Sequence, residues 1–395
     1  MKKDKFLAVC SALAFSLTMQ GCRRINPEIE LSSINEDDKS HYSFADTYQN
    51  LSEEDFYCFK SVEGRTTILD YESMSLTALC SKPNCHHTGD DCILHRLSGK
   101  NPMFSENYAY YFVDDVPQIV RNSDDHDELK LGSTLCRYDL TANEEEKLKH
   151  IDASVADLCY GWMLLQDTIY YIENTYSCSY DDAGNLISYS NTGGALSLCT
   201  IRLSDMQVTK LCNLYDVETL TKYYPLTPDS GGVQMKGLFD NKIYFNVAFV
   251  GGTDAFAMPD YHLYPTYYDL SDGTYHGTPE DYEHIDFAGV TYCSEDYLVI
   301  CRDGQASAWE KGDEQPVIFW DERFNHDCYL MSVFDDTIYC FGCGYDLNTK
   351  EDWKIDALYG KSVVAKYDDS YIISDYGMQE NFEKIPAEQL LHEMY

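Results

Sequence analysis

Basic residues are scarce in this chain. It has 29 Lys and Arg against 67 Asp and Glu in 395 residues, which gives a formal net charge of −38 at pH 7. A polyanion repels nucleic-acid phosphates and anionic lipid headgroups, because binding to both depends on Lys and Arg. The composition therefore excludes a nucleic-acid partner. The excess of carboxylates keeps the protein soluble and attracts cations and basic partners.

Long apolar runs and the common catalytic signatures are also missing. After the first 21 residues no apolar run reaches the length of about 20 residues that crosses a bilayer. The sequence has no H-E-x-x-H, no G-x-S-x-G, no Walker A loop and no dinucleotide-binding glycine fingerprint. The residues by themselves therefore favour a protein that is not an enzyme.

The N-terminus has the features of a secretory signal. Three lysines precede an uncharged, mostly apolar stretch from Phe6 to Met19, which is too short to span a membrane. The next residues, Met-Gln-Gly-Cys, resemble a bacterial lipobox, although a leucine usually stands where Met19 stands. This resemblance implies that diacylglycerol is attached to Cys22 and that the chain is cleaved before it. An ordinary signal peptide followed by an incidental cysteine is the alternative.

The expected address is the outer face of the cell membrane, with a lipid on Cys22, including palmitate-type acyl chains, as the anchor. Loss of residues 1–21, which carry three lysines and one aspartate, takes the formal net charge from −38 to −40. Residues 22–54 are polar and show little hydrophobic periodicity, so we expect a flexible tether. Residues 55–395 are expected to form a single folded domain.

A pattern of two or three acidic or polar residues followed by an apolar or aromatic pair recurs along this domain. It occurs, for example, in QDTIYYI (166–172) and DDTIYCF (335–341). Its pairs begin at Phe56, Ala109, Ile169, Ile243, Tyr297, Ile338 and Tyr371. Several copies are followed by Tyr-Asp-Leu or a variant that runs into a polar turn, as in GYDLNTKEDWKI (344–355). Tyr, Ile, Val and Phe favour strands, so each unit predicts a β-meander.

These units predict an all-β fold, a β-propeller with six or seven blades, seven being favoured. A small four-stranded sheet cannot bury both faces alone, whereas sheets packed face to face around an axis can. The copies are 33 to 74 residues apart, which brackets the roughly 40–50 residues of a propeller blade. The longer intervals hold insertions, at 122–129, 179–194 and 246–292. We expect strands from the two termini to close the ring; a pair of β-sandwiches is the alternative.

The chain resembles a group of uncharacterised surface lipoproteins of gut Gram-positive anaerobes that have propeller-like repeats. The resemblance lies in the lipobox, the repeated D-x-I-Y-Y strand starts and an early L-C-x-K-P-x-C-x-H…C segment. That segment is formed here by Leu79, Cys80, Lys82, Pro83, Cys85, His87 and Cys92. The group implies this fold and this address, but it brings no established activity.

Within that segment, Cys80, Cys85, His87 and Cys92 have the composition of a closed Cys3His zinc site. Thiolate and imidazole are donors that zinc prefers, and Pro83-Asn84 and Gly89-Asp90 are turn formers. We predict one structural zinc ion, which would tie down the turn after the first blade. A disulfide among these cysteines is the alternative, because exported domains commonly carry them. Free thiols are a third reading, and a catalytic zinc is less favoured.

Other candidate sites have weaker signals. Cys58, Cys136, Cys199, Cys301 and Cys340 lie among strand-forming residues, as small buried apolar side chains do. The C-x-x-C from Cys340 to Cys343 lacks the following helix that redox use requires. The segment YDDAGNL (180–186) lacks the alternating ligands of a calcium loop and is expected to be a hairpin turn. The acidic segment NSDDHDE (122–128) is expected to be a solvated loop.

The 34 tyrosines suggest a surface that stacks on sugars or peptides. Most of them, such as Tyr110, Tyr170, Tyr244 and Tyr339, fall on the repeated strands and are expected to pack between blades. Tyr261, Tyr264 and Tyr267 alternate with polar residues in an insertion and are the candidates for ligand binding. A reading of this segment as an ordinary strand and turn is the alternative.

The sequence therefore favours a membrane-anchored extracellular lipoprotein whose propeller binds a glycan, a peptide or an envelope protein through its inserted loops. Such a binding module predicts exposed aromatic side chains gathered at one rim. The alternatives are a lyase or hydrolase that acts on an extracellular polymer, which predicts a polar cluster in the central channel, and an accessory subunit of an envelope complex. The accessory subunit predicts an exposed apolar patch.

Overall fold

The structure is a computed structural model of the whole chain, and nearly all of it is β-structure. The described residues are 42–45, 52–53, 56–60, 66–78, 80, 92–93, 97, 102–105, 108–139, 141–142, 144–155, 161–190, 195–215, 226–251, 260–277, 288–302, 305–320, 332–340, 343–375 and 381–391.

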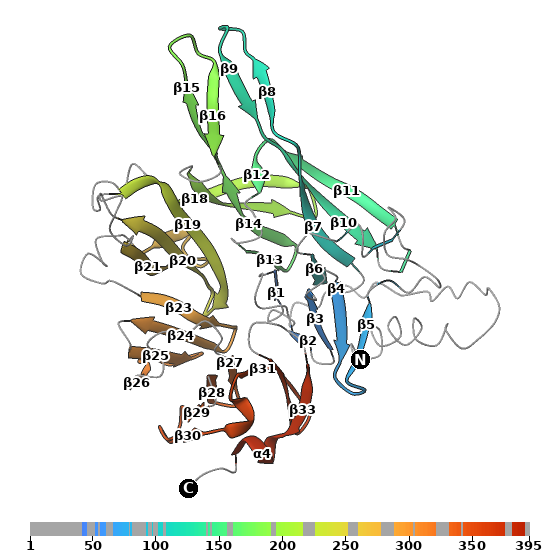
Figure 1. Cartoon of the computed structure of the whole chain (residues 1–395), viewed down its shortest axis with the longest axis vertical. Helices are drawn as coiled ribbons and strands as arrows, with labels where there is room; N and C mark the ends of the chain where they lie inside the picture. Colours follow the sequence, from blue (N-terminus) through green and yellow to red (C-terminus); the bar gives the residue numbers. More distant parts are fainter. Residues whose placement is uncertain are drawn as a thin grey trace, which may run out of the picture.

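Seven antiparallel sheets of three or more strands follow one another along the described chain. In Figure 1 these sheets, the blades, are arranged around a ring, from blue to red. Blade 1 has β2 (Ser52–Glu53), β3 (Phe56–Lys60), β4 (Thr66–Asp70) and β5 (Ser75–Ala78). Blade 2 has β6 (Met103–Ser105), β7 (Tyr108–Asp114), β10 (Ser133–Asp139) and β11 (Glu144–Ile151). Blade 3 has β12 (Ser154–Val155), β13 (Trp162–Leu165), β14 (Thr168–Asn174), β17 (Leu196–Arg202) and β18 (Gln207–Tyr215), together with β1 (Tyr42–Ala45).

The second half of the ring repeats the same meander. Blade 4 has β19 (Leu226–Phe239), β20 (Lys242–Gly251), β21 (Asp260–Asp269) and β22 (Thr274–His276). Blade 5 has β23 (Ala288–Cys293), β24 (Tyr297–Arg302), β25 (Gln305–Glu310) and β26 (Val317–Trp320). Blade 6 has β27 (Ser332–Phe334), β28 (Thr337–Cys340), β29 (Cys343–Asp346) and β30 (Asp352–Lys354), and then the 3-10 turn η3 (Asp356–Leu358). Blade 7 has β31 (Lys361–Tyr367), β32 (Ser370–Asp375) and β33 (Glu383–Pro386), followed by α4 (Ala387–Leu391).

Successive blades bury their apolar faces against each other. Separate core clusters join blades 2 and 3, 3 and 4, 4 and 5, 5 and 6, and 6 and 7. A sixth cluster joins the last blade to the first, with Leu69 and Tyr71 packed against Ala365 and Ile372. The fold is thus the all-β propeller that the repeats predict, and the described residues form seven blades.

In blades 4 and 6 the repeated strand start is a two-residue turn between the first and second strands of the blade. In blade 6 the turn is Asp335-Asp336, with φ of 48° and 59°, and in blade 4 it is Asp240-Asn241, with φ of 45° and 64°. Both residues of a type I′ turn need positive φ, which Asp and Asn tolerate better than most residues. The polar half of the repeat is therefore a requirement of the backbone.

The Tyr-Asp-Leu element is tied to the same turns. The backbone N–H of Leu347 donates to the carbonyl oxygen of Asp336 at 2.8 Å, and that of Leu270 donates to Asn241 at 3.0 Å. The preceding aspartate caps the next turn: in blade 6 the Asp346 carboxylate accepts the N–H groups of Asn348 and Thr349 at 2.8 and 2.7 Å. The two repeated sequence elements thus meet at one edge of each of these sheets.

The N-terminal strand β1 departs from the expected closure. It pairs with β13 of blade 3 and also lies against β6, the first strand of blade 2. In Figure 1 it lies near the centre of the ring. In the described residues no sheet combines strands of the first and last blades; side-chain packing joins them instead. Part of the predicted tether, residues 42–45, is therefore a strand of the propeller.

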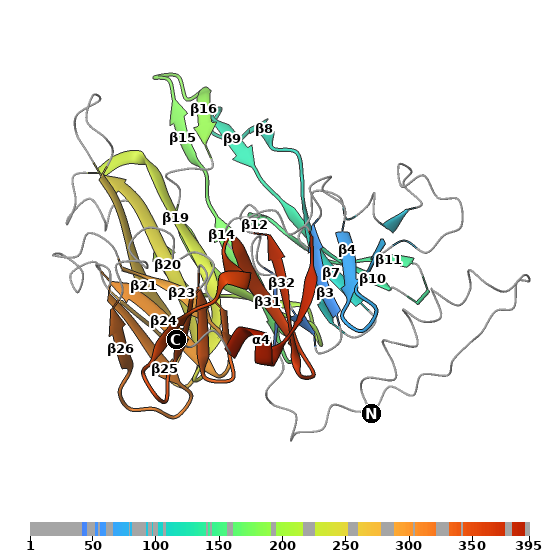
Figure 2. The ribbon, with the colours of Figure 1, turned by 60° about the horizontal axis from the view of Figure 1, so that its bottom comes forward.

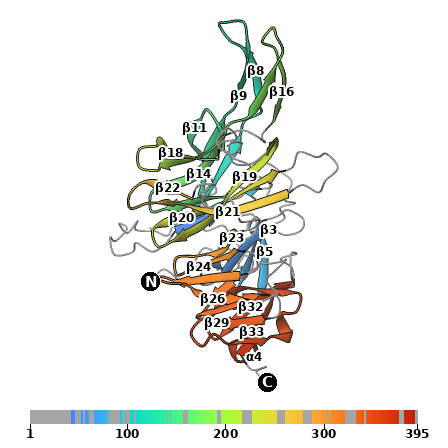
Figure 3. The same ribbon diagram turned by 90° about the vertical axis from the view of Figure 1, so that its left-hand side faces the viewer.

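Two hairpins project from the ring. One consists of β8 (Gln118–Arg121) and β9 (Asp127–Lys130), inserted between the second and third strands of blade 2. The other consists of β15 (Ser177–Tyr180) and β16 (Leu186–Ser190), inserted at the equivalent place in blade 3. Figures 1, 2 and 3 all show the two hairpins rising side by side away from the blades. They lie in two of the insertions that the sequence predicts.

Candidate functional site

The two hairpins form one unit, which we call the hairpin arm and define as residues 115–131 and 175–190. A backbone hydrogen bond closes the base of each hairpin where it leaves its blade. The N–H of Asp115 donates to the carbonyl of Gly132 at 2.7 Å, and the N–H of Thr175 donates to that of Ala195 at 3.0 Å. Because insertions on a rigid scaffold commonly carry recognition, the arm is the candidate functional site.

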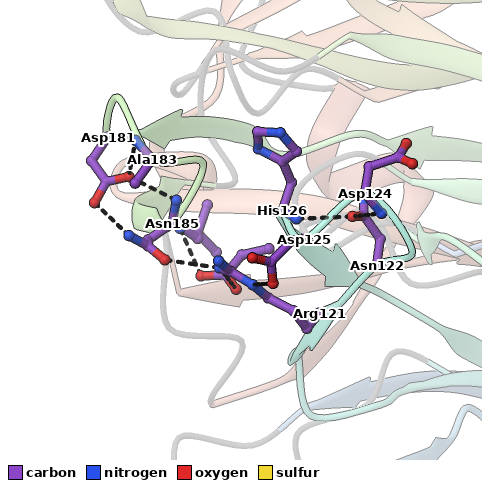
Figure 4. A network of polar contacts seen from close by, with 10 residues as sticks. Arg121, Asn122, Asp124, Asp125, His126, Asp181, Ala183 and Asn185 are labelled. Carbon is purple, nitrogen blue, oxygen red and sulfur yellow. Dashed lines mark hydrogen bonds and ion pairs between the residues drawn. The ribbon is translucent and has the colours of Figure 1, made fainter.

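Polar contacts join the tips of the hairpins. The guanidinium of Arg121 donates to the Asp127 carboxylate at 2.8 Å, to Asp125 at 3.0 Å and across to the side-chain oxygen of Asn185 at 2.8 Å. In the same place the N–H of Asp127 donates to the carbonyl of Gly184 at 2.9 Å. Figure 4 shows Arg121 between the two turns. The contacts from Arg121 and Asp127 to the second hairpin align the two insertions.

The turns at the two tips are held by their own side chains. The side-chain oxygen of Asn122 accepts the N–H groups of Asp124 and His126 at 3.0 and 2.9 Å. The Asp181 carboxylate accepts the N–H groups of Ala183 and Asn185 at 2.9 and 2.8 Å. The segment 180–186 is thus the hairpin turn that its sequence predicts.

Gly184 lies close against the tip of the other hairpin. Its φ is +79°, and a Cβ atom added there would lie 1.7 Å from Nδ1 of His126. No side chain larger than hydrogen fits between the turn and the imidazole ring. The glycine of the DDAGN turn is therefore required both by its backbone conformation and by the neighbouring hairpin.

Two carboxylates of the tip, Asp127 and Asp181, have a lowered pKa. Hydrogen bonding to Arg121, followed by the N–H of Leu186, lowers the pKa of Asp127 below its ordinary value of 3.8. Hydrogen bonds from Asn185 lower the pKa of Asp181. Both groups therefore remain charged at neutral pH, which keeps the Arg121 network intact.

The arm carries most of the exposed large apolar side chains in the described part of the chain. Five of nine lie on it: Val116 (81% exposed), Ile119 (54%), Tyr180 (47%), Ile187 (68%) and Tyr189 (44%). A monomeric protein seldom gathers such residues in one place without a binding role. Two of the five, Tyr180 and Tyr189, are aromatic and the other three are aliphatic, so the insertions expose a mixed apolar surface.

The predicted zinc site lies between blades 1 and 2. Cys80 lies two residues after the end of the last strand of blade 1, and both Cys80 and Cys92 are buried. Cys85 and His87 lie outside the described residues, as does Cys22. Among the residues that are described, no group of three or more His, Cys, Asp or Glu could hold a metal ion. The zinc ion and its disulfide alternative remain predictions.

The predicted ligand-binding tyrosines lie on a strand. All three belong to β21, the third strand of blade 4, which confirms the alternative reading of that segment as a strand. Tyr264 is 4% exposed and belongs to the core between blades 3 and 4, so its expected surface position is corrected. Alternation on a strand within the ring turns Tyr264, Thr266 and Tyr268 toward a neighbouring blade.

The other two predicted ligand-binding tyrosines, Tyr261 and Tyr267, lie on the same strand. Tyr267 is half-buried, and its ring stacks on that of His276 with centroids 4.8 Å apart. Tyr261 pairs with Val250 in the sheet, and its side chain lies outside the described residues. By contrast, Tyr110, Tyr244 and Tyr339 are buried between blades, as the sequence predicts.

A polar network joins blades 5, 6 and 7 at the edge where their turns lie. The Tyr297 hydroxyl donates to Asp336, and the Tyr371 hydroxyl donates to Asp335 at 2.9 Å. Lys366 pairs with Asp335, with its Nζ 2.6 Å from the carboxylate. Burial is the main cause that raises the pKa of Tyr297 and Tyr371, so both hydroxyls stay protonated. These side chains connect adjacent blades.

The cysteines on the blades resemble buried apolar residues. Cys136, Cys199 and Cys301 are buried, as the sequence predicts. Burial raises the pKa of the Cys199 thiol to about 12, which leaves it protonated and unreactive at neutral pH. Cys340 and Cys343 are register partners of the antiparallel strands β28 and β29, so the second cysteine begins a strand and not a helix.

Neither a protein-family model nor a curated protein sequence matches the chain. Among solved structures, an oligogalacturonate lyase in complex with manganese is similar, with 10% identity, a TM-score of 0.39, and 88% of this chain and 92% of that chain covered. The β-propeller domain of the Trilobed protease from Pyrococcus furiosus is similar at 9% identity and a TM-score of 0.31, covering 90% and 99%. Likenesses this distant carry no argument about chemistry. In the described part of the chain, no helix has the length and apolarity to cross a membrane.

Proposed function

We propose that the chain is a lipid-anchored protein on the extracellular face of the cell membrane, and that its propeller serves as a binding module. Its ligand is an extracellular glycan, peptide or envelope protein. The observation that supports this function is the hairpin arm: two insertions on neighbouring blades, aligned by the Arg121 network, that expose five large apolar side chains. Burying such side chains against a partner releases the water that covers them.

The binding role is tested by removing the arm where its backbone closes. Residues 116–131 and 176–194 are each replaced by Asn-Gly, which forms the tight turn of a hairpin. The labelled protein is incubated with envelopes of the cells that produce it, and the retained fraction is measured. We expect retention by the full chain and loss in the truncated one at equal thermal stability. Equal retention by both proteins contradicts the binding role of the arm.

The anchor is tested separately. The full chain and its Cys22→Ala variant are expressed in the native host, and membrane and medium are compared. We expect the unaltered protein in the membrane fraction with an acylated N-terminal peptide in mass spectrometry, and the variant in the medium. An unmodified Cys22 in a membrane-bound protein contradicts the lipid anchor.

The structural zinc is part of the same proposal. Cys80, Cys85, His87 and Cys92 would hold it through three thiolates and one imidazole, which is a composition typical of closed structural sites. Metal analysis of the purified protein should find zinc, and Cys85→Ser should lose it. Absence of zinc from the unaltered protein, or an unchanged content in the variant, contradicts this assignment.

A further inference from the structure

One hairpin of the arm has two chemically different faces. The residues from Tyr176 to Tyr180 alternate between Tyr or Cys and Ser, and Tyr189 pairs with Cys178 across the hairpin. Side chains alternate along a strand, and paired residues share a face. Tyr176, Cys178, Tyr180 and Tyr189 therefore lie on one face, which we call the aromatic face. Ser179 and Ser188 pair on the other face.

Contacts confirm that these side chains are neighbours. The rings of Tyr176 and Tyr189 have centroids 6.1 Å apart. The Sγ of Cys178 lies 3.9 Å from the carbonyl oxygen of Tyr176, and the interaction with Cys178 is the main cause that raises the pKa of Tyr180. Ile187 is the extra residue of a bulge beside Tyr180 and is strongly exposed. The face thus carries three tyrosines, and Ile187 adds an aliphatic side chain beside Tyr180.

The fold itself does not need this surface to face water. A two-stranded hairpin is marginally stable alone, and this one is held at its tip by polar contacts with the neighbouring hairpin. Serine and threonine at the aromatic positions would form the same strands without exposing apolar area. Tyrosine is also enriched in the centres of protein interfaces. The face therefore has the composition of a docking surface.

The charge around the face selects the partner. The arm contains seven Asp or Glu against one Arg and one Lys, a formal net charge of −5. Both cations are already paired, Arg121 with Asp125 and Asp127, and Lys130 with Glu128 at 2.7 Å. The negative charges of Glu128 and Asp127 also raise the pKa of Tyr180, so their field reaches the face. A partner with cationic groups at its rim is favoured.

We infer that the aromatic face binds a protein segment that presents aliphatic or aromatic side chains flanked by lysine or arginine. This inference rests on the proposed binding function and names the partner. A second copy of this chain would bring an equally acidic arm, and the repulsion between the arms opposes that pairing. A sugar would stack on the tyrosines but would leave the aliphatic margin of Ile187 poorly matched.

A random peptide display library provides the probe. It is panned on the purified full chain and counter-selected on a Tyr180→Ser/Tyr189→Ser variant, and the recovered peptides are synthesised. We expect peptides that combine apolar side chains with Lys or Arg. Their Kd, from fluorescence anisotropy, should rise by roughly tenfold or more in the double variant, as expected for central tyrosines of an interface. Binding should also weaken as salt is raised.

A matched control is available on other blades. Ile318 and Tyr359 are also strongly exposed, but they lie outside the arm. The Ile318→Ser/Tyr359→Ser variant removes a similar amount of exposed apolar surface and should bind the peptides as the unaltered chain does. Because all four side chains are exposed, both double variants should melt at the temperature of the unaltered chain, which excludes unfolding as the cause of lost binding.

Two results of the library would overturn the inference: no recovered peptide depends on Tyr180 and Tyr189, or the recovered peptides are acidic. Sedimentation of the unaltered chain as a dimer, and of the tyrosine variant as a monomer, would also overturn it. So would tyrosine-dependent binding to a glycan panel instead of peptides. The envelope experiment separates this failure from that of the proposed function. If truncation of the arm abolishes retention and the tyrosine variant keeps it, only the aromatic face is wrong.

Discussion

At the scale of single residues, the alignment of the two hairpins of the arm depends on one small residue and one charged side chain. Gly184 has a positive φ and lies against the ring of His126, and Arg121 joins two carboxylates of its own hairpin to Asn185 of the other. The free energy of these exposed contacts is small. Their role is to fix the position of one hairpin relative to the other.

Replacing Gly184 by alanine should separate the two hairpins. The added methyl group overlaps the His126 ring, so the ring or the turn has to shift and the two tips lose their close fit. We expect faster deuterium exchange in residues 115–131 and 177–190 by mass spectrometry, without a change in the blades. Gly312→Ala is the matched control, because Gly312 also has a positive φ but no atom lies within 4 Å of the point that an added Cβ would occupy. Adding His126→Ala to Gly184→Ala should restore slow exchange; failure to do so contradicts the contact.

Acid should weaken the contact between the two hairpins of the arm. The pKa of Asp127 is lower in the folded arm than its ordinary value of 3.8, so the arm gains stability from this group above that value. The gain is lost as the pH falls below about 4 and through the lowered pKa. Exchange protection of the β9 and β16 amides should therefore decrease in this range. In Asp127→Asn the decrease should be smaller, and the remainder is assigned to Asp181, whose pKa is also lowered; an unchanged decrease contradicts the role of Asp127.

At the scale of elements, the turns explain the sequence repeat. In blades 4 and 6 the two Asp or Asn residues before the apolar pair adopt positive φ in a tight hairpin, and the leucine of the following Tyr-Asp-Leu donates its N–H back to the second of them. The polar part of the pattern therefore reflects the turn geometry. A single sequence reveals this geometry because Asp and Asn are among the few residues that tolerate positive φ.

The turn of blade 4 provides a test. Asn241 has a φ of +64°, a conformation that β-branched residues avoid. Asn241→Val should destabilise the protein by about 1–3 kcal/mol, seen as a lower denaturant midpoint. Asn241→Gly should leave the midpoint unchanged or raise it. A valine variant as stable as the unaltered protein would contradict the role of this turn.

The same elements show what the sequence could and could not predict. Strand alternation and turn chemistry are local, so the blades and their approximate number follow from the pattern. The burial of Tyr264 depends on which neighbouring blade covers its face, and no local signal contains that information. The pairing of β1 with β13 joins residues about 120 positions apart and is equally hidden.

The candidate site was only partly predictable for a related reason. The sequence identifies 122–129 and 179–194 as insertions, but their contact through Gly184 and His126 depends on the tertiary structure. One local signal was present, the alternation of Tyr or Cys with Ser from Tyr176 to Tyr180. It predicts a strand with one aromatic face, and it would have favoured this hairpin over the segment around Tyr264.

At the scale of the whole molecule, the ring depends on contact between its ends. Leu69 and Tyr71 of blade 1 pack against Ala365 and Ile372 of blade 7, and the Nζ of Lys384 lies 3.3 Å from the Tyr71 carbonyl. These contacts link residues about 300 positions apart. They form only when the last blade is complete, so closure is expected to be a late and cooperative step.

Truncation of Leu69 tests this closure. Leu69→Ala leaves a cavity between the first and last blades and should cost about 2–5 kcal/mol, with a lower melting temperature. Leu76→Ala, in the same blade but at an exposed position, is the control and should change the melting temperature little. Equal stability of the two variants would show that the ends of the ring do not hold each other.

The position of β1 determines how an anchored molecule would hang. The chain enters the domain beside the inner strands of blades 2 and 3, near the middle of the ring in Figure 1. With a lipid on Cys22, the tether would therefore join the propeller near its central axis and not at its outer rim. Rotation of the propeller about this axis would carry the tyrosines of the hairpin arm around a circle. A partner at any point on that circle could be reached while the anchor stays in place.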